Sequence, residues 1–456
     1  MAALSSTLRL ACSQWSRPWG RIPGLRLGIG VRSATHIAKG SVVAHGKEEP
    51  TPVGEAIASA IKATGPMSVA QYMRQALQSP LGGYYHEHRG DLLGAKGDFT
   101  TSPEISQMFG ELIGVWYVAT WRQQQQQRAK KAHASTTSSR GTDQPIRIIE
   151  LGPGRGTLMA DMLRAMKRFS DFYERVQEVH FIESSAALRQ AQRSAVQVPD
   201  MPEAPQLNQS YRSEQGLSVQ WHARWDDLAL AESGPCYNIV MAHEFFDALP
   251  VYRLQFTDKG WREIMVDVDE TQASDRRFRF VLSPNATHAT KSLTIAPHFP
   301  KTQFQPGNTL EISPDSWGAA NAIAKLIQEQ GGSGLVVDYG DNHPFADSLR
   351  AVSKHKFTHP LTRPGTVDLT ADVDFSLLRN AMAGRVSCYG PVQQNMFLGH
   401  MGIETRLSML LKNTSTLAER NDLVTGFNRL VDPLHMGKVY KFMSIVDSPL
   451  PPVAFV

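Results

Sequence analysis

The sequence predicts an α/β protein built on a mostly parallel sheet with helices on both faces. Two observations lead to this fold class. Between residues 146 and 242, short apolar runs alternate with segments whose apolar residues have helical spacing, and this order is typical of parallel strands joined by helical crossovers. The length of 456 residues, of which 41% are apolar, suits one large domain with additions, or two domains.

Five apolar runs are expected to be strands of this sheet, and helical segments join the first three of them. The predicted strands are residues 146–151, 178–183, 218–223, 237–242 and 334–340, and the predicted helices are 156–169 and 184–196. Three closely spaced runs with alternating polarity lie between the fourth and fifth strands. They predict an antiparallel insertion at about 251–330, over one edge of the sheet.

An N-terminal helical region is expected over residues 47–121. Helix-spaced apolar residues flank a Gly65-Pro66 break, and Ser102-Pro103-Glu104 is typical of a helix start. Residues 122–144 contain five consecutive glutamines and then a Lys-, Ser- and Thr-rich run. Because this composition builds no core, it predicts a disordered insertion. The main domain would then be residues 145–456.

The first 46 residues carry six arginine or lysine residues and no acid. A basic, serine-containing, acid-free segment is typical of a mitochondrial transit peptide, so residues 1–46 are expected to direct the protein to the matrix. The whole chain has a formal net charge of +4, and removing these six charges leaves −2. The remaining chain therefore has no charge-based reason to bind nucleic acid.

Two further classes of protein are disfavoured by composition. No apolar run reaches the roughly 18 residues that a membrane-spanning helix needs, so we expect no membrane span. Of the three cysteines, Cys12 lies in the transit segment, and Cys236 and Cys388 are far apart. We therefore expect neither a metal site nor a disulfide framework.

The most informative segment is Glu150-Leu-Gly-Pro-Gly-Arg-Gly-Thr157, which follows a predicted strand and opens a predicted helix. Its glycines (Gly152, Gly154 and Gly156) allow a tight turn and close approach of a ligand to the backbone. The spacing is G-x-G-x-G, whereas a dinucleotide site has G-x-G-x-x-G, and Thr157 stands at that third glycine position. Glu150 would repel a pyrophosphate but attract a cation. The segment therefore favours S-adenosylmethionine, with its sulfonium and ammonium groups, as the cofactor.

Two more acids fit the nucleoside of this cofactor. Glu183 ends the second strand, where a carboxylate can accept hydrogen bonds from both ribose hydroxyls; the alternative is a cap on the following helix. Asp226 follows the third strand and could accept the adenine amino group, although Asp227 or neither acid is also plausible. Residues 100–104 could form a lid over the cofactor.

Over roughly residues 50–450, the sequence resembles the MidA-like methyltransferase family. The segments that carry the resemblance are SPLGGYY, GDFTTSPEISQMFGE, ELGPGRGTLMADML, HEFFDALPV, LVVDYGD and GTVDLTADVDF. The resemblance implies a Rossmann-like, seven-stranded class I methyltransferase fold. It also implies symmetric dimethylation of an arginine on the 49-kDa iron–sulfur subunit of respiratory complex I, as a step in the assembly of that complex.

Catalytic carboxylates are expected after the fourth strand, because an arginine cation needs acids around it and ligands bind at the carboxyl ends of strands in open α/β sheets. Glu244 follows that strand directly and is the first candidate; the alternative is an acid that caps a helix over 245–249. Asp247 could share its face or form a turn. His243 could accept the released proton or be structural. Asp338, at the end of the later strand, could be a second guanidinium carboxylate.

Three other functions remain as alternatives. An RNA methyltransferase acting on amino groups typically has Asn/Asp-Pro-Pro-aromatic after the fourth strand, where this chain has His243-Glu244-Phe245-Phe246. A cytosine-C5 enzyme needs a Pro-Cys at that strand end, but Pro235-Cys236 precedes the strand. A small-molecule methyltransferase is the second alternative. The third is a non-catalytic assembly chaperone for complex I, which the intact glycines and nucleoside acids disfavour.

Overall fold

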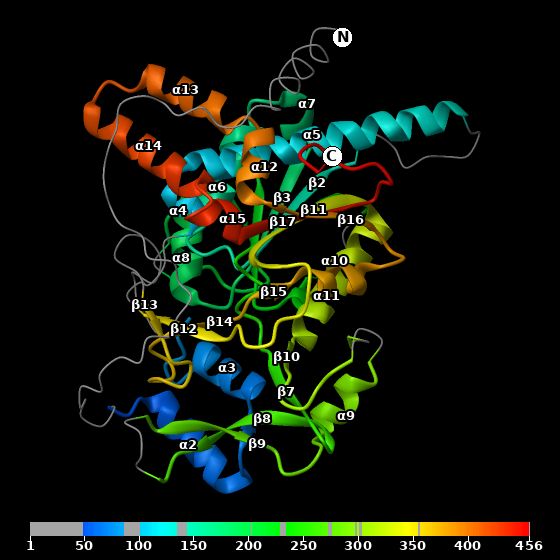
Figure 1. The fold of residues 1–456 in the computed structure, drawn as a ribbon. Helices are drawn as coiled ribbons and strands as arrows, with labels where there is room; N and C mark the ends of the chain where they lie inside the picture. Colours follow the sequence, from blue (N-terminus) through cyan, green and yellow to red (C-terminus); the bar gives the residue numbers. More distant parts are fainter. Residues whose placement is uncertain are drawn as a thin grey trace, which may run out of the picture. The chain divides into compact units, whose positions relative to one another are not determined.

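The computed structural model describes residues 49–85, 101–134, 144–201, 203–228, 234–271, 276–296, 299–300, 303–353 and 356–455. The segment 1–46 lies outside these residues, so the transit peptide stays a prediction. The chain from Gly46 onward is one compact unit, and Figure 1 labels its helices and strands.

The main sheet has nine strands in the order β16-β17-β11-β6-β2-β3-β5-β4, with the short β15 beside β11. Its strands are β2 (Ile146–Leu151), β3 (Val176–Ile182), β4 (Ser210–Arg212), β5 (Ser218–His222), β6 (Tyr237–His243), β11 (Gly332–Asp341), β15 (Val373–Asp374), β16 (Ser387–Gln393) and β17 (Tyr440–Val446). The neighbours β5, β3, β2, β6 and β11 are parallel. At the edges, β4, β17 and β16 are antiparallel to their neighbours.

The α/β fold class and all five predicted strands are confirmed, and β2 has the predicted bounds. The sheet is more mixed than predicted, and it has nine strands instead of the seven that the resemblance implied. Every residue of β2 and β6 is buried. Strands covered on both faces are mostly apolar instead of alternating, which is why these two could be recognised from the sequence despite polar residues such as Arg147 and Glu150.

Helices cover both faces of the sheet. On one face, α5 (Gln107–Ala134) and α6 (Thr157–Met166) pack in one core with Ile148. On the other, α10 (Pro314–Gln330) and α11 (Phe375–Met382) pack in one core with Ile149. The remaining short helices beside the parallel strands are α7 (Ser170–Tyr173), α8 (Ala186–Ala195) and the 3₁₀ turn η1 (Trp225–Asp227).

Helices α5 and α6 lie unusually close together because two glycines, one helical turn apart, face α6. A side-chain carbon at Gly110 would lie 2.6 Å from Cβ of Asp161, and one at Gly114 would lie 2.8 Å from the carbonyl oxygen of Met162. Contacts that short do not occur between these atoms, so only glycine permits this approach. Helix α6, which follows the glycine loop, is thus fixed against α5 by close contact.

The predicted disordered insertion 122–144 is wrong over residues 122–134, which continue α5. Glutamine is a good helix former, and one of the five is part of the interior: Gln124 is 3% exposed and donates a hydrogen bond to the carbonyl oxygen of Gly332 at 3.2 Å. At the start of the tract, Arg122 forms an ion pair with Asp171. Residues 135–143 lie outside the described part of the chain.

A second, antiparallel sheet has the order β1-β8-β7-β10, with β9 beside β8. Its strands are β1 (Met67–Ser68), β7 (Tyr252–Thr257), β8 (Gly260–Val268), β9 (Phe278–Leu282) and β10 (Thr309–Ile312), and α9 (His288–Thr294) follows β9. The three alternating runs of the sequence are therefore antiparallel strands, as predicted. A third sheet contains β12 (Arg350–Ser353), β13 (Lys356–Thr358) and β14 (Asp368–Thr370).

The N-terminal helices pack against this second sheet and not as a separate lobe. Helix α2 (Pro52–Thr64) ends before the predicted Gly65-Pro66 break, and α3 (Val69–Gln78) begins at a capping box between Ser68 and Gln71. Both helices share one apolar core with β8 and β14. Helices α2 and α3 therefore support the β14 segment, which borders the cavity described below.

Four helices connect β16 to β17: α12 (Gln394–His400), α13 (Ile403–Asn413), α14 (Leu417–Val431) and α15 (Met436–Val439). Helix α14 packs closely on α4 (Ser102–Ile105), because Gly426 has no side chain. A Cβ at this position would lie 3.1 Å from the carbonyl oxygen of Ile105. Within the described ranges, no helix is long and apolar enough to cross a membrane.

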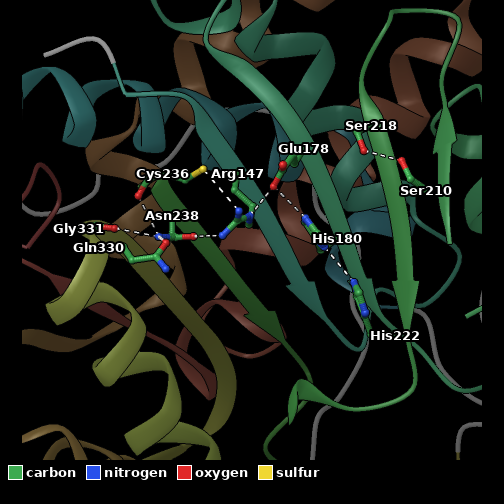
Figure 2. Close-up of polar contacts among 10 residues, drawn as sticks. All are labelled: Arg147, Glu178, His180, Ser210, Ser218, His222, Cys236, Asn238, Gln330 and Gly331. Carbon is green, nitrogen blue, oxygen red and sulfur yellow. Dashed lines mark hydrogen bonds and ion pairs between the residues drawn. The ribbon is translucent and has the colours of Figure 1, made fainter. Parts of the chain in front are cut away.

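A buried polar chain crosses β2, β3 and β5 (Figure 2). Arg147, which is fully buried, donates to Glu178 at 2.6 Å, and His180 lies between Glu178 (3.3 Å) and His222 (3.0 Å). The hydrogen bond from His180, with the Arg147 guanidinium, lowers the pKa of Glu178 to about 2. Burial lowers the pKa of His222 to about 4. This row of polar side chains therefore contains one ion pair and neutral histidines near pH 7, and it links the three strands.

Candidate active site

One cavity lies at the carboxyl ends of the parallel strands, where ligands bind in open α/β sheets. It has a volume of about 240 Å³. Eight of the eleven predicted site residues line it: Glu150, Gly152, Gly154, Thr157, Glu183, His243, Glu244 and Asp247. The other three, Gly156, Asp226 and Asp338, do not.

The glycine loop has the left-handed backbone that its sequence predicts. The φ angles of Gly152, Gly154 and Gly156 are 63°, 53° and 84°, a region that glycine adopts without the strain of a side chain. Gly156 serves packing, since a Cβ there would lie 3.0 Å from Cα of Gln192 on α8. The first two glycines border the cavity and the third brings α6 against α8.

Glu150 is the acid at the end of β2, and its side chain is nearly enclosed. The residue is 2% exposed, and its Oε2 atom has no hydrogen-bond partner among the described residues. Burial raises the pKa of Glu150 to about 8. An unpartnered buried carboxylate facing a cavity fits a ligand with a positive charge, and the ammonium of S-adenosylmethionine carries one.

Helix α4 brings a second acid to the glycine loop. The hydroxyl of Thr157, the first residue of α6, donates to Oε1 of Glu104 at 2.5 Å. Thr101, Pro103 and Glu104 all line the cavity. The segment predicted as a lid therefore contacts the end of the glycine loop, where α6 begins, although its action as a lid stays a prediction.

The two nucleoside acids have different surroundings. Glu183 lines the cavity, accepts from the amide of Ser185 at 2.8 Å and from Gln192 at 3.3 Å, and has its pKa raised to about 7 by burial. Both the cap and the ribose contact remain compatible with this geometry. By contrast, the side chain of Asp226 is 80% exposed and faces Arg224 at 3.7 Å. The structure does not bring Asp226 to the cavity.

Glu244 follows β6 with a strained backbone. Its φ angle is 47°, a left-handed value that is uncommon for residues other than glycine and is concentrated at functional sites. Its amide donates to the carbonyl oxygen of Val337 at 3.0 Å, and its Oε1 accepts from the hydroxyl of Tyr440 at 2.9 Å. Burial, with repulsion from Asp247, raises the pKa of Glu244 to about 8. No helix forms over 245–249, so the alternative of a helix cap is wrong.

Asp247 is the second carboxylate of this loop. It is 7% exposed, and its Oδ2 accepts from the hydroxyls of Tyr339 and Thr370. Its Oδ1 has no partner among the described residues. Burial raises the pKa of this carboxyl above its ordinary value. Like Glu150, Asp247 is therefore a buried acid with an unused oxygen at the cavity.

Asp338 has a supporting position behind the loop. It is fully buried, and its carboxylate accepts from the amides of Phe246, Asp247 and Tyr339 at 3.1, 3.3 and 3.0 Å. Because these backbone donors occupy both oxygens and the residue does not line the cavity, the prediction that Asp338 holds the substrate directly finds no support. It orients the loop that carries Glu244 and Asp247.

His243 lines the cavity but is a weak base. Its ring packs against Phe109 at 5.2 Å, and its Nε2 atom, 3.6 Å from Oε1 of Glu244, has no hydrogen-bond partner among the described residues. Burial lowers the pKa of His243 to about 3. The imidazole is therefore neutral at physiological pH and has one nitrogen free to accept a proton or a hydrogen bond.

Two cavity residues escaped the sequence reasoning. Asp368 of β14 lines the cavity, and its Oδ1 accepts from the hydroxyl of Tyr85 at 2.9 Å. Both lie in segments that supported the family resemblance, SPLGGYY and GTVDLTADVDF, but neither follows a strand of the predicted sheet. Their presence in those segments was the available signal. Across the described ranges, no group of three or more His, Cys, Asp or Glu residues could hold a metal ion.

A family model and curated relatives match most of the chain. The model, described as "Putative S-adenosyl-L-methionine-dependent methyltransferase", matches residues 112–392. The mitochondrial protein arginine methyltransferase NDUFAF7 of Xenopus tropicalis is 38% identical over 405 residues, covering 86% of each chain. The Homo sapiens protein of the same name is 36% identical over 401 residues, covering 87% of this chain and 83% of the relative.

Solved structures share the fold. A protein from Burkholderia thailandensis, bound to S-adenosyl-homocysteine, has a TM-score of 0.63 and 19% identity, over 88% of this chain and 93% of that chain. A native structure from the same organism has a TM-score of 0.64, 20% identity and the same coverage.

Proposed function

This chain belongs to the S-adenosyl-L-methionine-dependent methyltransferase family matched above, and we propose that it methylates the guanidinium group of an arginine in a protein. The curated relatives are named protein arginine methyltransferases, and the cavity has the charge that such a substrate needs. The observation that carries the proposal is a pair of buried carboxylates with unused oxygens, Glu150 and Asp247, in one cavity.

Two unused carboxylates favour two cationic ligands. Glu150 lies beside the glycine loop and suits the cofactor's ammonium, with Glu183 on the ribose. Asp247 lies with Glu244 on the loop after β6 and suits the substrate. A guanidinium is a permanent cation with several N–H donors, so it can satisfy both carboxylates of that loop at once. The same acids would repel the phosphates of RNA, which disfavours the nucleic-acid alternative.

When bound, the cofactor supplies a methyl group on a positively charged sulfur. The protein's own residues position the acceptor for in-line transfer, which accounts for most of the rate that such an enzyme provides. Glu244 and Asp247 hold the guanidinium, and Asp338 keeps their loop in place through three backbone amides. The proton released from the methylated nitrogen passes to Glu244, whose raised pKa makes it a better acceptor than His243.

The finer identity of the substrate rests on the resemblance and on the relatives' names. We propose symmetric dimethylation of an arginine on the 49-kDa iron–sulfur subunit of complex I, in the mitochondrial matrix, during assembly of that complex. Mass spectrometry of complex I subunits from cells with and without this protein tests it. Loss of symmetric dimethylarginine from that subunit is the expected result, and an unchanged subunit would contradict it.

The test also separates the alternatives. If the protein were a non-catalytic chaperone, its loss would lower the amount of complex I without changing arginine methylation. The Glu244→Gln variant would then restore assembly in cells that lack the protein as well as the wild type does. If the protein were a small-molecule methyltransferase, the purified protein would methylate no complex I subunit.

The transit peptide is tested by localisation. A chain that begins at Lys47 should fold and bind cofactor but stay outside mitochondria, and its import would contradict the transit peptide at 1–46.

The fold assignment can also be refined. We propose that β16, β17, β11, β6, β2, β3 and β5 are the seven strands of the class I methyltransferase core, and that β4 and β15 are additions. Their order and the antiparallel β17 support it. The antiparallel insertion, predicted at about 251–330, ends with β10 at Ile312, because residues 314–330 form α10 on the main sheet. It is then an addition that brings the N-terminal helices and β14 to the substrate side.

A further inference from the structure

We infer that Tyr440 is a positioning residue for methyl transfer: its hydroxyl holds one carboxylate oxygen of Glu244, so that the other oxygen faces the arginine and receives the released proton. The inference deepens the proposed function and rests on it, because that function makes Glu244 the proton acceptor. It gives a part in the reaction to the antiparallel strand β17, although Tyr440 itself does not line the cavity.

The hydrogen bond between Tyr440 and Glu244 spans a strand. Tyr440 begins β17 and Glu244 follows the last residue of β6, and β11 lies between these two strands. The Tyr440 hydroxyl donates to Oε1 of Glu244 at 2.9 Å. The Glu244 amide donates to the carbonyl oxygen of Val337 on β11 at 3.0 Å. The main chain of Glu244 is thus held by β11 and its side chain by β17.

The ring of Tyr440 is fixed by aromatic neighbours on two sides. Tyr440 is 9% exposed. Its ring is nearly parallel to the imidazole of His243, at 6.4 Å between centroids, and meets the ring of Tyr339 edge to face at 5.6 Å. Tyr339 is also the residue of β11 that pairs with Tyr440. Packing of this kind holds a side chain in one rotamer, so the hydroxyl has a defined direction.

The backbone before Tyr440 is fixed to the helices between β16 and β17. The Tyr440 amide donates to the carbonyl oxygen of Met436, and the Gly437 amide donates to that of Asp432 at 3.1 Å. A Cβ at Gly437 would overlap the carbonyl oxygen of Val431, the last residue of α14, so only glycine permits this turn. Helices α14 and α15 therefore set the position at which Tyr440 enters the sheet.

The contacts of the Glu244 carboxylate leave one oxygen for a ligand. Within the described residues, both side-chain contacts of Glu244 use Oε1: the Tyr440 hydroxyl, and Nε2 of His243 at 3.6 Å, which is longer than a hydrogen bond. Glu244 lines the cavity, and its side chain is 13% exposed. A phenol is a neutral donor, so it orients the carboxylate without cancelling its charge. Oε2 is therefore the oxygen that a guanidinium in the cavity meets.

The Tyr440 hydroxyl also makes Glu244 more acidic. The titratable groups that face the Glu244 carboxyl are His243, Asp247, Asp338, Asp368 and Tyr440. Burial, with repulsion from Asp247 and Asp368, raises the pKa of Glu244 to about 8, and the hydrogen bond from Tyr440 acts in the opposite direction. His243 is neutral, because burial lowers its pKa to about 3. Without the hydroxyl, Glu244 should stay protonated, and unable to accept the proton, up to a higher pH.

The test compares Tyr440→Phe with Tyr237→Phe. Tyr237 begins β6, at the opposite end of the strand that precedes Glu244. It is fully buried, and its hydroxyl donates to Ser333 at 3.1 Å. Each variant therefore loses one buried tyrosine hydroxyl and its hydrogen bond, but only Tyr440 contacts Glu244.

Initial rates with tritiated S-adenosylmethionine and the purified 49-kDa subunit are measured from pH 6 to pH 10. Tyr440→Phe should lower kcat at pH 7 about 10-fold, the scale of one hydrogen bond to a charged group. The loss should be smaller at pH 9, because the ionisation of Glu244 that limits kcat moves to higher pH. Cofactor affinity, measured by calorimetry, should be unchanged, and Tyr237→Phe should keep the wild-type profile. Added to Glu244→Gln, Tyr440→Phe should change the rate by no more than about two-fold.

A Tyr440→Phe enzyme with the pH profile of the wild type overturns the inference. So does a loss that is equal at every pH or that persists beside Glu244→Gln, because Tyr440 would then act independently of Glu244. A wild type that makes no methylarginine refutes the proposed function instead, and the contact is then judged without turnover. In protein with ¹³C-labelled glutamate carboxyls, the NMR signal that Glu244→Gln removes should titrate at higher pH in Tyr440→Phe than in the wild type, and equal titration overturns the inference.

If Tyr440→Phe does not fold, replacement of Tyr440 by 3-fluorotyrosine decides. The fluorine keeps the shape of the ring and makes the phenol a stronger hydrogen-bond donor. The Glu244 signal and the rise of kcat should then move to lower pH. An enzyme in which both stay at their wild-type positions would overturn the inference.

Discussion

Replacing Glu150 by glutamine should stabilise the cofactor-free protein, and increasingly so as pH rises. The buried carboxyl has a pKa of about 8, against 4.5 for an ordinary glutamate. Because the pKa is raised in the folded state, the contribution of Glu150 to stability is fully present below pH 4.5 and is lost as pH rises to about 8. Since each pKa unit is worth about 1.4 kcal/mol, the wild type loses about 3 kcal/mol by pH 7 and about 5 kcal/mol by pH 9. Glu150→Gln avoids this loss.

Urea unfolding of the cofactor-free wild type and variant at pH 5, 7 and 9 measures the difference. Glu178→Gln is the matched control, because the hydrogen bond from His180 and the Arg147 guanidinium lower the pKa of Glu178 to about 2. The stability that Glu178 contributes is present above pH 4.5 and is lost as pH falls through 2. Glu178→Gln should therefore destabilise the protein by about 3 kcal/mol at pH 7, an effect opposite in sign to that of Glu150→Gln.

A gap between Glu150→Gln and wild type that stays constant from pH 5 to 9 would refute the reasoning, because the burial of the charge would then cost nothing. The same variant should lose the stabilisation that S-adenosyl-homocysteine gives the wild type at pH 9. Greater stability together with lost ligand response would indicate that the carboxylate is kept for binding.

Three other changes test separate parts of the site. Glu244→Gln should reduce methyl transfer about 100-fold with nearly normal cofactor affinity; a variant that turns over at the wild-type rate would exclude its catalytic role. Gly154→Val should abolish cofactor binding in calorimetry, since Gly154 borders the cavity and a branched residue is strained at a φ angle of 53°; unchanged affinity would contradict the assignment of this loop. Gly114→Ala should lower the stability by about 1–3 kcal/mol through overpacking against Met162, seen as a lower melting temperature, and an unchanged melting temperature would show that α5 can move away from α6.

The parts of the fold that were predictable are those whose signal is local. Strand β2 and the glycine loop after it are consecutive in the chain, so the apolar run, the acid and the turn could be recognised together. The same holds for Glu244, which directly follows β6. Position in the sequence could not distinguish Asp338 from Asp247, because each is an acid near the predicted end of a strand. Only the tertiary structure shows that Asp338 faces three backbone amides.

The parts that escaped prediction depend on contacts between distant segments. Asp368 and Tyr85 are separated by 283 positions, and apart from lying in segments that supported the family resemblance, neither residue is marked as part of a site by its local sequence. Composition was misleading for residues 122–134, where low complexity predicted disorder. A glutamine tract has high helix propensity, and here a neighbouring sheet and the C-terminal segment accept its hydrogen bonds.

The glutamine tract in α5 has a genetic consequence. Gln123 donates to the carbonyl oxygen of Pro451 at 3.0 Å, Gln124 to that of Gly332 at 3.2 Å, and Gln127 accepts from Ser448 at 2.7 Å. A disordered tract tolerates the gain or loss of a residue. In a helix, one residue more or less rotates everything beyond it by about 100°. Alleles that differ in tract length should therefore encode proteins with mispaired glutamines and lower steady-state abundance.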